Sequence, residues 1–267
     1  MTATRPEQPV PDYVAPHDLL AGKVVVVTAA AGAGIGAAVV RRALEEGAKA
    51  VVLSDTHKRR VAEVGSALAD EFGAERVRSR VCDVTQEADV TALLDAADEV
   101  GGVDVMINNA GLGGTAAITE MTDDQWSRVL DITLTGTMRC VRAASNRMIA
   151  AGTKGVIINN ASVVGWRAQE GQAHYAAAKA GVMALTRCAA LDVAAHGIRV
   201  NAVSPSLAMH PFLAKVTSDE LLHELTQREA FGRAAEPWEV ANVMIFLACD
   251  YSSYLTGEVI SVSSQHA

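Results

Sequence analysis

The chain has 267 residues, of which 50% are hydrophobic and 20% are charged, and its mean hydropathy is +0.18. A chain of this kind buries roughly three quarters of its unfolded surface, which excludes intrinsic disorder for most of its length. The formal net charge of −8 disfavours nucleic acid as a partner, because like charges repel a phosphate backbone. At about 150 residues per domain the length suggests one or two domains, and because a single α/β unit of this size is normal, one domain is the economical interpretation.

The N-terminal segment differs from the rest of the chain. Residues 1–21 carry four of the seven prolines and lack the cationic start and apolar core of a signal peptide, so we expect an extended arm ahead of a single domain over residues 22–267. The uncharged stretch Val24–Val40 is too short for a membrane span. Scattered cysteines without metal-ligand spacing predict no metal site and a reducing, cytoplasmic environment. They are Cys82, Cys140, Cys188 and Cys249.

Short apolar runs rich in β-branched residues alternate with longer segments of helical period. The runs predict strands at Lys23–Thr28, Ala50–Ser54, Val103–Asn108 and Val156–Asn160, with weaker candidates at Arg76–Val81, Arg199–Val203 and Val259–Val262. The segments predict helices at Ile35–Glu46, His57–Phe72, Glu87–Val100, Asp123–Ala150, Ala173–His196 and Pro237–Ala248. Strands alternating with helices favour an α/β fold, a doubly wound parallel sheet of about seven strands with helices on both faces.

One connection is unusually long. Residues 206–235 lie between a late strand and the last helix, and such insertions often act as substrate lids. The apolar residues of this segment either line a pocket for an apolar substrate or pack a helical hairpin onto the body of the domain. They are Leu207, Met209, Phe212, Leu213 and Val216.

A glycine-rich loop follows the first strand. From Thr28 the sequence reads TAAAGAGIG and then enters a helix, whose free N–H groups and positive dipole end suit a pyrophosphate. Asp55 lies 19 residues after Gly36, at the end of the second strand, where a carboxylate can hold the ribose hydroxyls. A strand, loop, helix and acid in this order predict a Rossmann-type dinucleotide site, with NAD favoured over NADP.

A second constellation follows the middle of the chain. Tyr175 and Lys179 are four residues apart in a predicted helix, so both side chains emerge on one face, where an ammonium favours ionisation of the phenol. Taken alone, such a pair is more often a solvated lysine beside a partly buried tyrosine. Ser162 follows a buried strand at the edge where α/β proteins bind ligands, and its hydroxyl can bond a substrate oxygen.

Together these motifs resemble the short-chain dehydrogenase/reductase family, over essentially all of residues 22–262. The residues that carry the resemblance are the glycine-rich loop, Asp83, Asn108–Gly111, Ser162, Tyr175, Lys179 and Asn201–Pro205. The resemblance implies that Tyr175 is the general acid/base, that Ser162 orients the substrate oxygen, and that Lys179 lowers the tyrosine pKa and holds the nicotinamide ribose. It also implies that Asp83 lies near the adenine and that Asn109 supports the sheet beside the cofactor.

The loop and the resemblance together predict which residues bind the cofactor. The predicted set is Gly32, Gly34, Ile35, Gly36, Asp55, Asp83, Val84, Asn109, Ala110, Gly111, Tyr175, Lys179 and Pro205.

Several positions depart from the family pattern. The segment from Thr28 to Gly36 spans nine residues where eight are usual, so we expect a rebuilt loop. Thr133 replaces an asparagine that belongs to a proton relay through water to the lysine, so the relay is either rewired or weaker. Ser206 replaces a glycine and His210 a threonine that often contacts the nicotinamide amide. His174 is about 100° around the helix from Tyr175, which favours a pocket-edge or surface position.

The predicted function is the interconversion of a ketone and a secondary alcohol by an NAD(P)-dependent oxidoreductase. The stretch Gly171–Gly181 is most similar to 3-oxoacyl-thioester (CoA or ACP) reductases and 3-hydroxyacyl dehydrogenases. The alternatives are a hydroxysteroid or steroid-fragment dehydrogenase, favoured by the apolar 206–216 segment, and a non-catalytic dinucleotide sensor or scaffold. The expected partners are an apolar small-molecule substrate and further copies of the chain in a homodimer or homotetramer, with no membrane.

Overall fold

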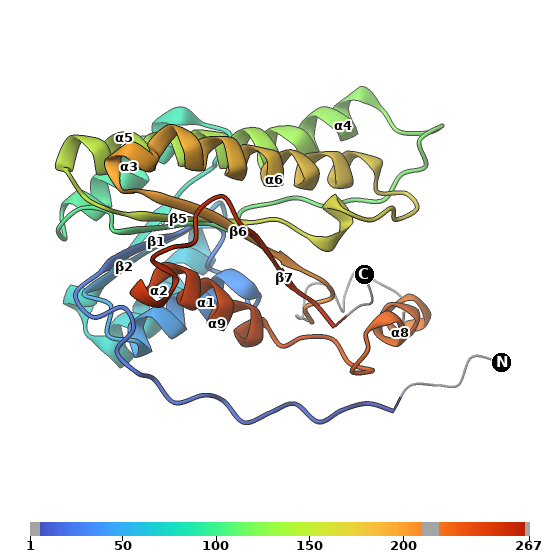
Figure 1. The fold of residues 1–267 in the computed structure, drawn as a ribbon, viewed down its shortest axis with the longest axis horizontal. Helices are drawn as coiled ribbons and strands as arrows, with labels where there is room; N and C mark the ends of the chain where they lie inside the picture. The colour runs from blue at the N-terminus through green and yellow to red at the C-terminus, as the bar shows by residue number, and fades with distance from the viewer. Residues whose placement is uncertain (1–5, 210–218, 265–267) are drawn as a thin grey trace.

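The sheet is the centre of the structure, a computed structural model that describes residues 6–209 and 219–264. Within these residues, seven parallel strands form one sheet in the order β3-β2-β1-β4-β5-β6-β7 (Figure 1). The strands are β1 (Val24–Val27), β2 (Ala50–Asp55), β3 (Val77–Val81), β4 (Val105–Asn108), β5 (Val156–Asn160), β6 (Arg199–Pro205) and β7 (Val259–Val262). The predicted doubly wound α/β sheet is therefore confirmed.

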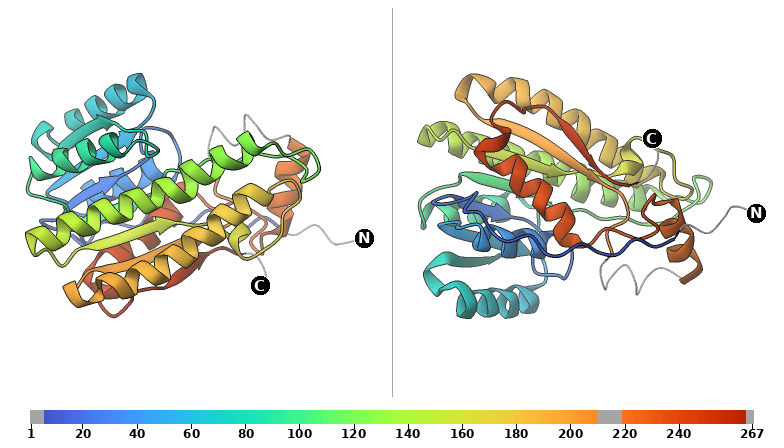
Figure 2. Two further views of the ribbon diagram at one scale, coloured as in Figure 1. Left: turned by 90° about the horizontal axis from the view of Figure 1, so that it is seen from above. Right: turned by 60° about the horizontal axis from the view of Figure 1, so that its bottom comes forward.

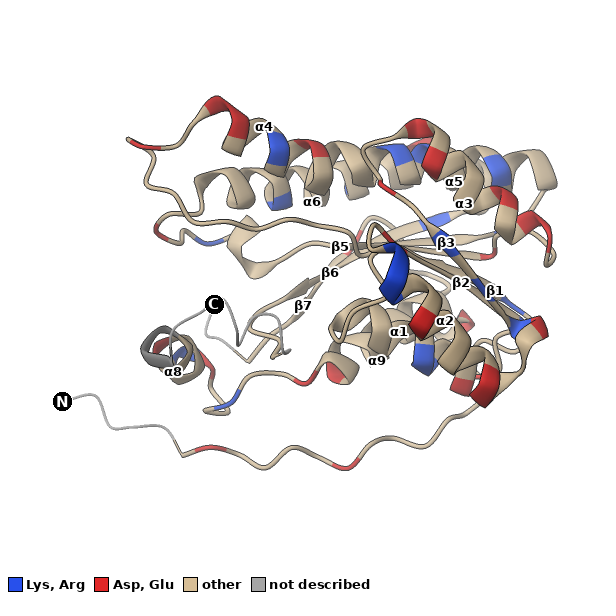
Figure 3. Cartoon of the chain, turned by 180° about the vertical axis from the view of Figure 1, so that it is seen from behind, with Lys and Arg blue, Asp and Glu red and all other residues tan. Residues whose placement is uncertain are grey.

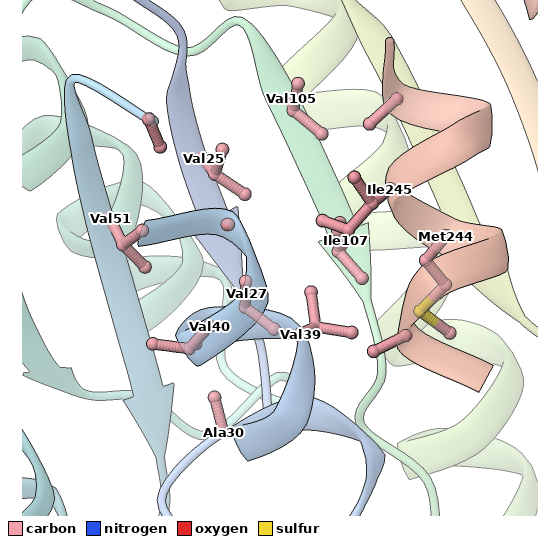
Figure 4. Close-up of a cluster of buried hydrophobic side chains, with 14 of the residues drawn as sticks. Val25, Val27, Ala30, Val39, Val40, Val51, Val105, Ile107, Met244 and Ile245 are labelled. Carbon is pink, nitrogen blue, oxygen red and sulfur yellow. The ribbon is translucent and has the colours of Figure 1, made fainter. Parts of the chain in front are cut away.

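Alternate residues of each central strand enter different cores, which explains why the runs are apolar throughout. Val25 and Val27 of β1 face one core, and Val24 and Val26 face the other. Figure 4 shows the first core, where β1, β2 and β4 pack against two helices across the sheet face. Strand β3 lies at the sheet edge and carries polar side chains between its two valines, so it was a weaker candidate from sequence.

The helices form two layers (Figure 1). One layer contains α3 (Glu87–Asp98), α4 (Asp123–Leu130), α5 (Gly136–Ala151) and α6 (Ala173–Val193). The other contains α1 (Ile35–Glu45), α2 (Lys58–Phe72) and α9 (Pro237–Ala248), with α8 (Asp219–Arg228) beyond the end of the sheet. Short 3₁₀ turns lie at Ala74–Arg76, Val163–Gly165, Ala194–His196 and Asp250–Ser252.

The predicted single helix Asp123–Ala150 is wrong in one respect. A π-helical turn at Asp131–Thr135 separates α4 from α5. Such a turn widens the helix and frequently marks a functional site. The helix expected to reach His196 ends as an α-helix at Val193, and β6 extends two residues further than expected, to Pro205.

The N-terminal arm is not free in solvent. From residue 6 onward it starts near α8, runs along the layer of α1 and α9, and leads into β1 (Figures 1 and 2). Arg42 of α1, only 3% exposed, donates to the carbonyl oxygens of Val14 and Ala15. Glu46, fully buried, accepts from the amides of His17 and Leu19 and pairs with Arg42. One buried ion pair therefore holds the arm through its backbone.

The arm also makes an aromatic contact. The ring of Tyr13 packs edge-on against Trp238 with centroids 5.3 Å apart, and its hydroxyl donates to Glu45. Leu20 is fully buried in the core that α1 and α9 cover. The arm thus covers the face that these two helices present.

The segment 206–235 lies partly outside the described residues. The predicted contacts of His210, Phe212, Leu213 and Val216 lie in that part, outside the described residues. The described residues Leu207 and Met209 pair with Ala235 through backbone hydrogen bonds, which brings the two ends of the segment together.

We expect Arg42→Met to destabilise the protein by about 3 kcal/mol, because it leaves the Glu46 carboxylate buried without its charged partner. The matched control is Arg41→Met, which removes an exposed pair with Glu71 and should cost less than about 1 kcal/mol. Urea unfolding followed by circular dichroism measures both values. Equal losses in the two variants would contradict this account of how the arm is held.

Candidate active site

The strand order reverses between β1 and β4, and ligands of doubly wound sheets bind beyond the carboxyl ends of the strands at this point. The loops that leave β1 and β4 are the glycine-rich loop and the segment that begins at Asn109. Ser162 follows the next strand, β5, at the same edge. The topology therefore brings the predicted cofactor and catalytic residues to one edge of the sheet.

The glycine-rich loop leaves the helix entrance open to an anion. Gly34 caps α1 without a side-chain hydrogen bond, and the first turn carries no acid, so amide donors remain available at the positive end of the helix. A Cβ on Gly36 would lie 2.5 Å from the Ala29 oxygen and 2.6 Å from the Asn109 side-chain nitrogen. The close approach requires glycine at this position, and the cradle fits a dinucleotide pyrophosphate.

The departure from the family loop has a visible effect. Ala29 stands where the family has glycine and adopts a left-handed conformation with φ of 52°. This conformation costs an alanine roughly 1–2 kcal/mol, which the surrounding contacts must offset. The amide of Ala30 donates to the Ser54 oxygen at 2.7 Å, and the Ala29 oxygen accepts from the Asn109 amide group.

Thr28 and Asn109 join the glycine-rich loop to the strands beside it. The Thr28 hydroxyl accepts from the amides of Asn109 and Ala110, both at 3.0 Å. Asn109 in turn accepts from the Asn160 side chain at 2.9 Å. The Asn160 main-chain oxygen then accepts from Lys179 Nζ at 2.5 Å. A continuous hydrogen-bonded path thus runs from the phosphate loop to the lysine.

Lys179 is 3% exposed, and its Nζ lies 5.5 Å from the centroid of the Tyr175 ring. Burial lowers the pKa of Lys179 to about 8, so the side chain is still an ammonium at neutral pH. Burial raises the pKa of Tyr175 above its usual value, and a side-chain hydrogen bond with Ser162 opposes that rise. The structure therefore brings the three residues together, with burial as the largest influence on the tyrosine.

Thr133 lies in the π-helical turn and is fully buried. Its hydroxyl accepts from the Leu112 amide at 2.9 Å and donates to the Leu112 oxygen at 3.2 Å. A Cβ on Gly111 would lie 3.4 Å from Lys179 Nζ and 3.7 Å from the Thr133 hydroxyl oxygen. Thr133 thus fastens the loop that passes over the lysine.

The adenosine end of the predicted site contains both acids and bases. The Asp55 carboxylate accepts from the His57 amide at 3.1 Å and lies 3.4 Å from an Arg60 guanidinium nitrogen. Figure 3 shows the basic first turn of α2 beside the end of β2. Arg60 therefore lies against Asp55 while its side chain stays 47% exposed, and Arg59 pairs with Glu63.

The remaining predicted residues lie at the same edge. Asp83 follows β3 and accepts from the amide and hydroxyl of Thr85, and Val84 packs where α5 begins at Gly136. Pro205 ends β6 next to Val262 of β7. His174 was expected at a pocket edge or on the surface; it is only 2% exposed, so the surface position is wrong. Its Nδ1 accepts from the Tyr175 amide at 2.9 Å.

Two features were not predicted from the sequence. Thr28 and Asn160 complete the path to Lys179, and the only sequence signal for them is their position beside Asn109 and Ser162 at strand ends. A pocket of about 430 Å³ lies beside the first turn of α6. It is lined by Ala116, Ala117, Ile118, Thr119, Ala168, Gln169, Glu170, Gly171, Ala173 and Ala176.

Residues 6–209 and 219–264 contain neither a metal-binding cluster nor a membrane-spanning helix. No group of three or more histidine, cysteine or acidic side chains could hold a metal ion there. No helix of the same residues is long and apolar enough to cross a membrane. All four cysteines are free thiols, and only Cys188 is exposed.

A nucleotide cradle at the switch point beside a serine, tyrosine and lysine cluster defines a nicotinamide-dependent oxidoreductase. A family profile described as enoyl-(acyl carrier protein) reductase matches residues 29–264. With this match and the relatives below, the chain belongs to the short-chain dehydrogenase/reductase family.

Named relatives act on alcohols and ketones. One, from Mycobacterium tuberculosis, is (5R,7aS)-5-hydroxy-7a-methyl-1-oxo-2,3,5,6,7,7a-hexahydro-1H-indene-carboxyl-CoA reductase, 61% identical over 96% of this chain and 97% of its own. Another is the cis-4-hydroxycyclohexanecarboxylate dehydrogenase of Sinomonas cyclohexanicum, 42% identical over 92% of this chain and 96% of its own. The crystal structure of a short chain dehydrogenase from Mycobacterium smegmatis is similar with a TM-score of 0.85 and 54% identity, over 97% of this chain and 99% of that one.

We expect Gly36→Ala to weaken binding of the dinucleotide by at least about tenfold, because the new methyl group displaces Ala29 or Asn109 from the cradle. Gly113→Ala is the matched control, since a Cβ there meets nothing within 4 Å and Gly113 is not one of the predicted cofactor contacts. Titration of nicotinamide fluorescence measures both dissociation constants. Similar losses in the two variants would refute the close approach at Gly36.

The buried lysine predicts how stability depends on pH. Above its folded pKa of about 8 the folded state releases the Lys179 proton, whereas the unfolded chain keeps it until its ordinary pKa near 10.5. Between pH 8 and 10 the unfolded state therefore binds more protons, and the free energy of unfolding should rise by up to about 1.4 kcal/mol per pH unit relative to Lys179→Met. Urea unfolding at several pH values tests this. Parallel curves for the wild type and the variant would contradict it.

Proposed function

We propose that the enzyme interconverts a ring ketone and a secondary alcohol on a carboxyl-CoA thioester with a fused-ring skeleton. The observation that carries the reaction is the cluster of Ser162, Tyr175 and Lys179 beside the nucleotide cradle. The substrate class rests on the relative with 61% identity, whose name specifies a fused-ring carboxyl-CoA, and the cyclohexane ring of the second relative agrees with it. This proposal combines the thioester and the steroid-fragment alternatives of the sequence analysis.

The second candidate is a linear 3-oxoacyl thioester. The family profile, with its acyl-carrier-protein description, favours it, as does the similarity of Gly171–Gly181 to thioester reductases. A hydroxysteroid would present a fused ring without the thioester. The three classes therefore differ in two chemical features, the ring and the thioester, which can be varied separately.

In the proposed mechanism Tyr175 is the general acid and base. In the direction of reduction, the phenol gives its proton to the carbonyl oxygen while the carbonyl carbon gains a hydride, and in oxidation both transfers reverse. The bound nicotinamide supplies or accepts that hydride. Ser162 donates a hydrogen bond to the same oxygen and fixes its position. The Lys179 ammonium stabilises the phenolate that remains and holds the nicotinamide ribose.

Thr133 belongs to this mechanism as a positioning residue and as the proposed replacement in the proton relay. Both lone pairs and the proton of a hydroxyl can serve hydrogen bonds, so the two bonds to Leu112 leave one acceptor position for water. The proposed cofactor contacts are those of the cradle, Gly32–Gly36, together with Asp55, Asp83, Val84, Asn109–Gly111 and Pro205.

A panel of substrates distinguishes the candidates. Reduction of a fused-ring oxo-carboxyl-CoA, a linear 3-oxoacyl-CoA and a 3-oxosteroid is followed by loss of absorbance at the nicotinamide band. We expect the highest kcat/KM for the fused-ring thioester. A higher value for the linear thioester would transfer the proposal to the second candidate, and no reduction of any ketone with either dinucleotide would reject both.

We expect Tyr175→Phe to lower kcat by at least about a thousandfold with little change in dinucleotide affinity, because it removes the proton donor and almost no volume. Single-turnover kinetics and nicotinamide fluorescence measure the two quantities. Substantial residual turnover would identify another acid. Phe246→Leu, an equally mild change on the exposed surface, is the control and should leave both quantities unchanged.

We also propose that NAD is preferred to NADP. At about 4 Å, the 2′-phosphate of NADP and the Asp55 carboxylate repel each other by roughly 4 kcal/mol per unit charge at an effective dielectric constant near 20, before screening. The neighbouring Arg60 offsets part of this repulsion. We expect NADH to bind more tightly than NADPH, and Asp55→Ala to reduce or reverse the difference. Tighter binding of NADPH by the wild type would contradict this proposal and would indicate that Arg60 binds the 2′-phosphate.

The predicted homodimer or homotetramer is part of the proposal. The segments expected to form the contacts between subunits are α4 together with α5, and α6. They expose the large apolar side chains of Trp126, Ile149 and Leu191. Light scattering after size-exclusion chromatography measures the state, and a monomer at micromolar concentration would reject this part.

A further inference from the structure

The chain leaves β6 at the rim of the candidate site. Asn160 of β5 pairs in register with Val203 of β6, so Ser162 and Pro205, each two residues further on, are level with each other on neighbouring strands. Strands are about 4.8 Å apart, so the backbone that leaves β6 through Ser206 and Leu207 begins next to Ser162, the residue proposed to bind the substrate oxygen. The position of these two residues therefore bears on how a substrate fits against Ser162.

A buried carboxylate meets this rim. Glu229, just after α8, is only 1% exposed. Its Oε1 accepts from the Leu207 amide at 3.3 Å, and its Oε2 accepts from the Ser264 hydroxyl at 2.9 Å. The Ala230 amide returns a bond to the Ser264 oxygen at 2.8 Å. Glu229 thus joins three segments that are distant in sequence: the end of β6, the base of α8 and the tail after β7.

The N-terminal arm fastens the same turn from the other side. The Gln8 amide donates to the Phe231 oxygen at 2.8 Å. Gly232 has a φ of +65°, and a Cβ there would lie 2.8 Å from the Pro6 oxygen, so the arm and the turn are in direct backbone contact. The turn at Glu229–Gly232 is therefore held on both sides.

We propose that Glu229 is a positioning residue for the substrate, setting the place of Ser206 and Leu207 relative to Ser162. This inference rests on the proposed function. A buried carboxylate is costly unless it is hydrogen-bonded, and the two oxygens of Glu229 accept from donors on two separate segments. A glutamine side chain has only one acceptor oxygen and could not accept both bonds in this way. The requirement explains an acid in a position where an apolar side chain would be cheaper to bury.

The test is Glu229→Gln, which keeps the size of the side chain but turns one acceptor into a donor. Glu224→Gln is the matched control, because Glu224 is an exposed acid on α8, the helix just before Glu229, and is paired with Arg228. Ser264→Ala removes one of the bonds without touching the acid and serves if Glu229→Gln fails to fold. Measured quantities are KM and kcat for the bicyclic ketone trans-1-decalone with NADH, the NADH dissociation constant, and hydrogen exchange of the Leu207 amide.

We expect KM to rise about tenfold in Glu229→Gln and less in Ser264→Ala, with kcat and NADH affinity within about twofold of the wild type and faster exchange at Leu207. Glu224→Gln should change none of these. An unchanged KM in both Glu229→Gln and Ser264→Ala overturns the inference, as does an equal loss of NADH affinity. If the wild type reduces no ketone, the proposed function fails instead, and unchanged exchange at Leu207 would then overturn the positioning role.

Discussion

The structure of the site depends on the burial of one ammonium group. Lys179 reaches the end of the sheet from α6 and donates to the Asn160 oxygen, which holds its charge 5.5 Å from the centroid of the Tyr175 ring. Burying this charge costs stability, as its lowered pKa shows. Because water screens charges least in a buried site, the Lys179 ammonium interacts more strongly with its neighbours there than it would at the surface. The strands, the π-helical turn and the loop over Gly111 all serve to enclose it.

The enclosure is continuous with the nucleotide cradle. Asn109 touches the loop of β1 on one side and Asn160 on the other, so side-chain amides join the close contact at Gly36 to the group that binds the lysine. Cofactor and proton-transfer groups are therefore parts of one hydrogen-bonded structure. This arrangement explains why the family motifs occur at strand ends, since only there do neighbouring strands present polar groups to one another.

The sheet and the site were predictable because their signals are local. Val24–Val27 shows the apolar run of a strand buried on both faces, and the spacing of Tyr175 and Lys179 fixes their common face. The π-helical turn at Asp131–Thr135 was not predictable, because its residues also suit an α-helix and tertiary contacts decide between the two. The docking of the arm was missed for a related reason. Arg42 and Glu46 look like an ordinary exposed helix pair until the arm covers them.

The contacts of Pro6 and Ser264 bear on whether the chain can be circularly permuted. Both residues touch the turn at Glu229–Gly232, so the two described ends of the chain lie against one short piece of backbone. A peptide linker of a few residues would span them, and a circularly permuted chain could open at a surface turn such as Gly152 without cutting the sheet. By the same geometry, a fusion partner joined directly to Pro6 or to Ser264 would lie beside the rim where substrates are expected to enter.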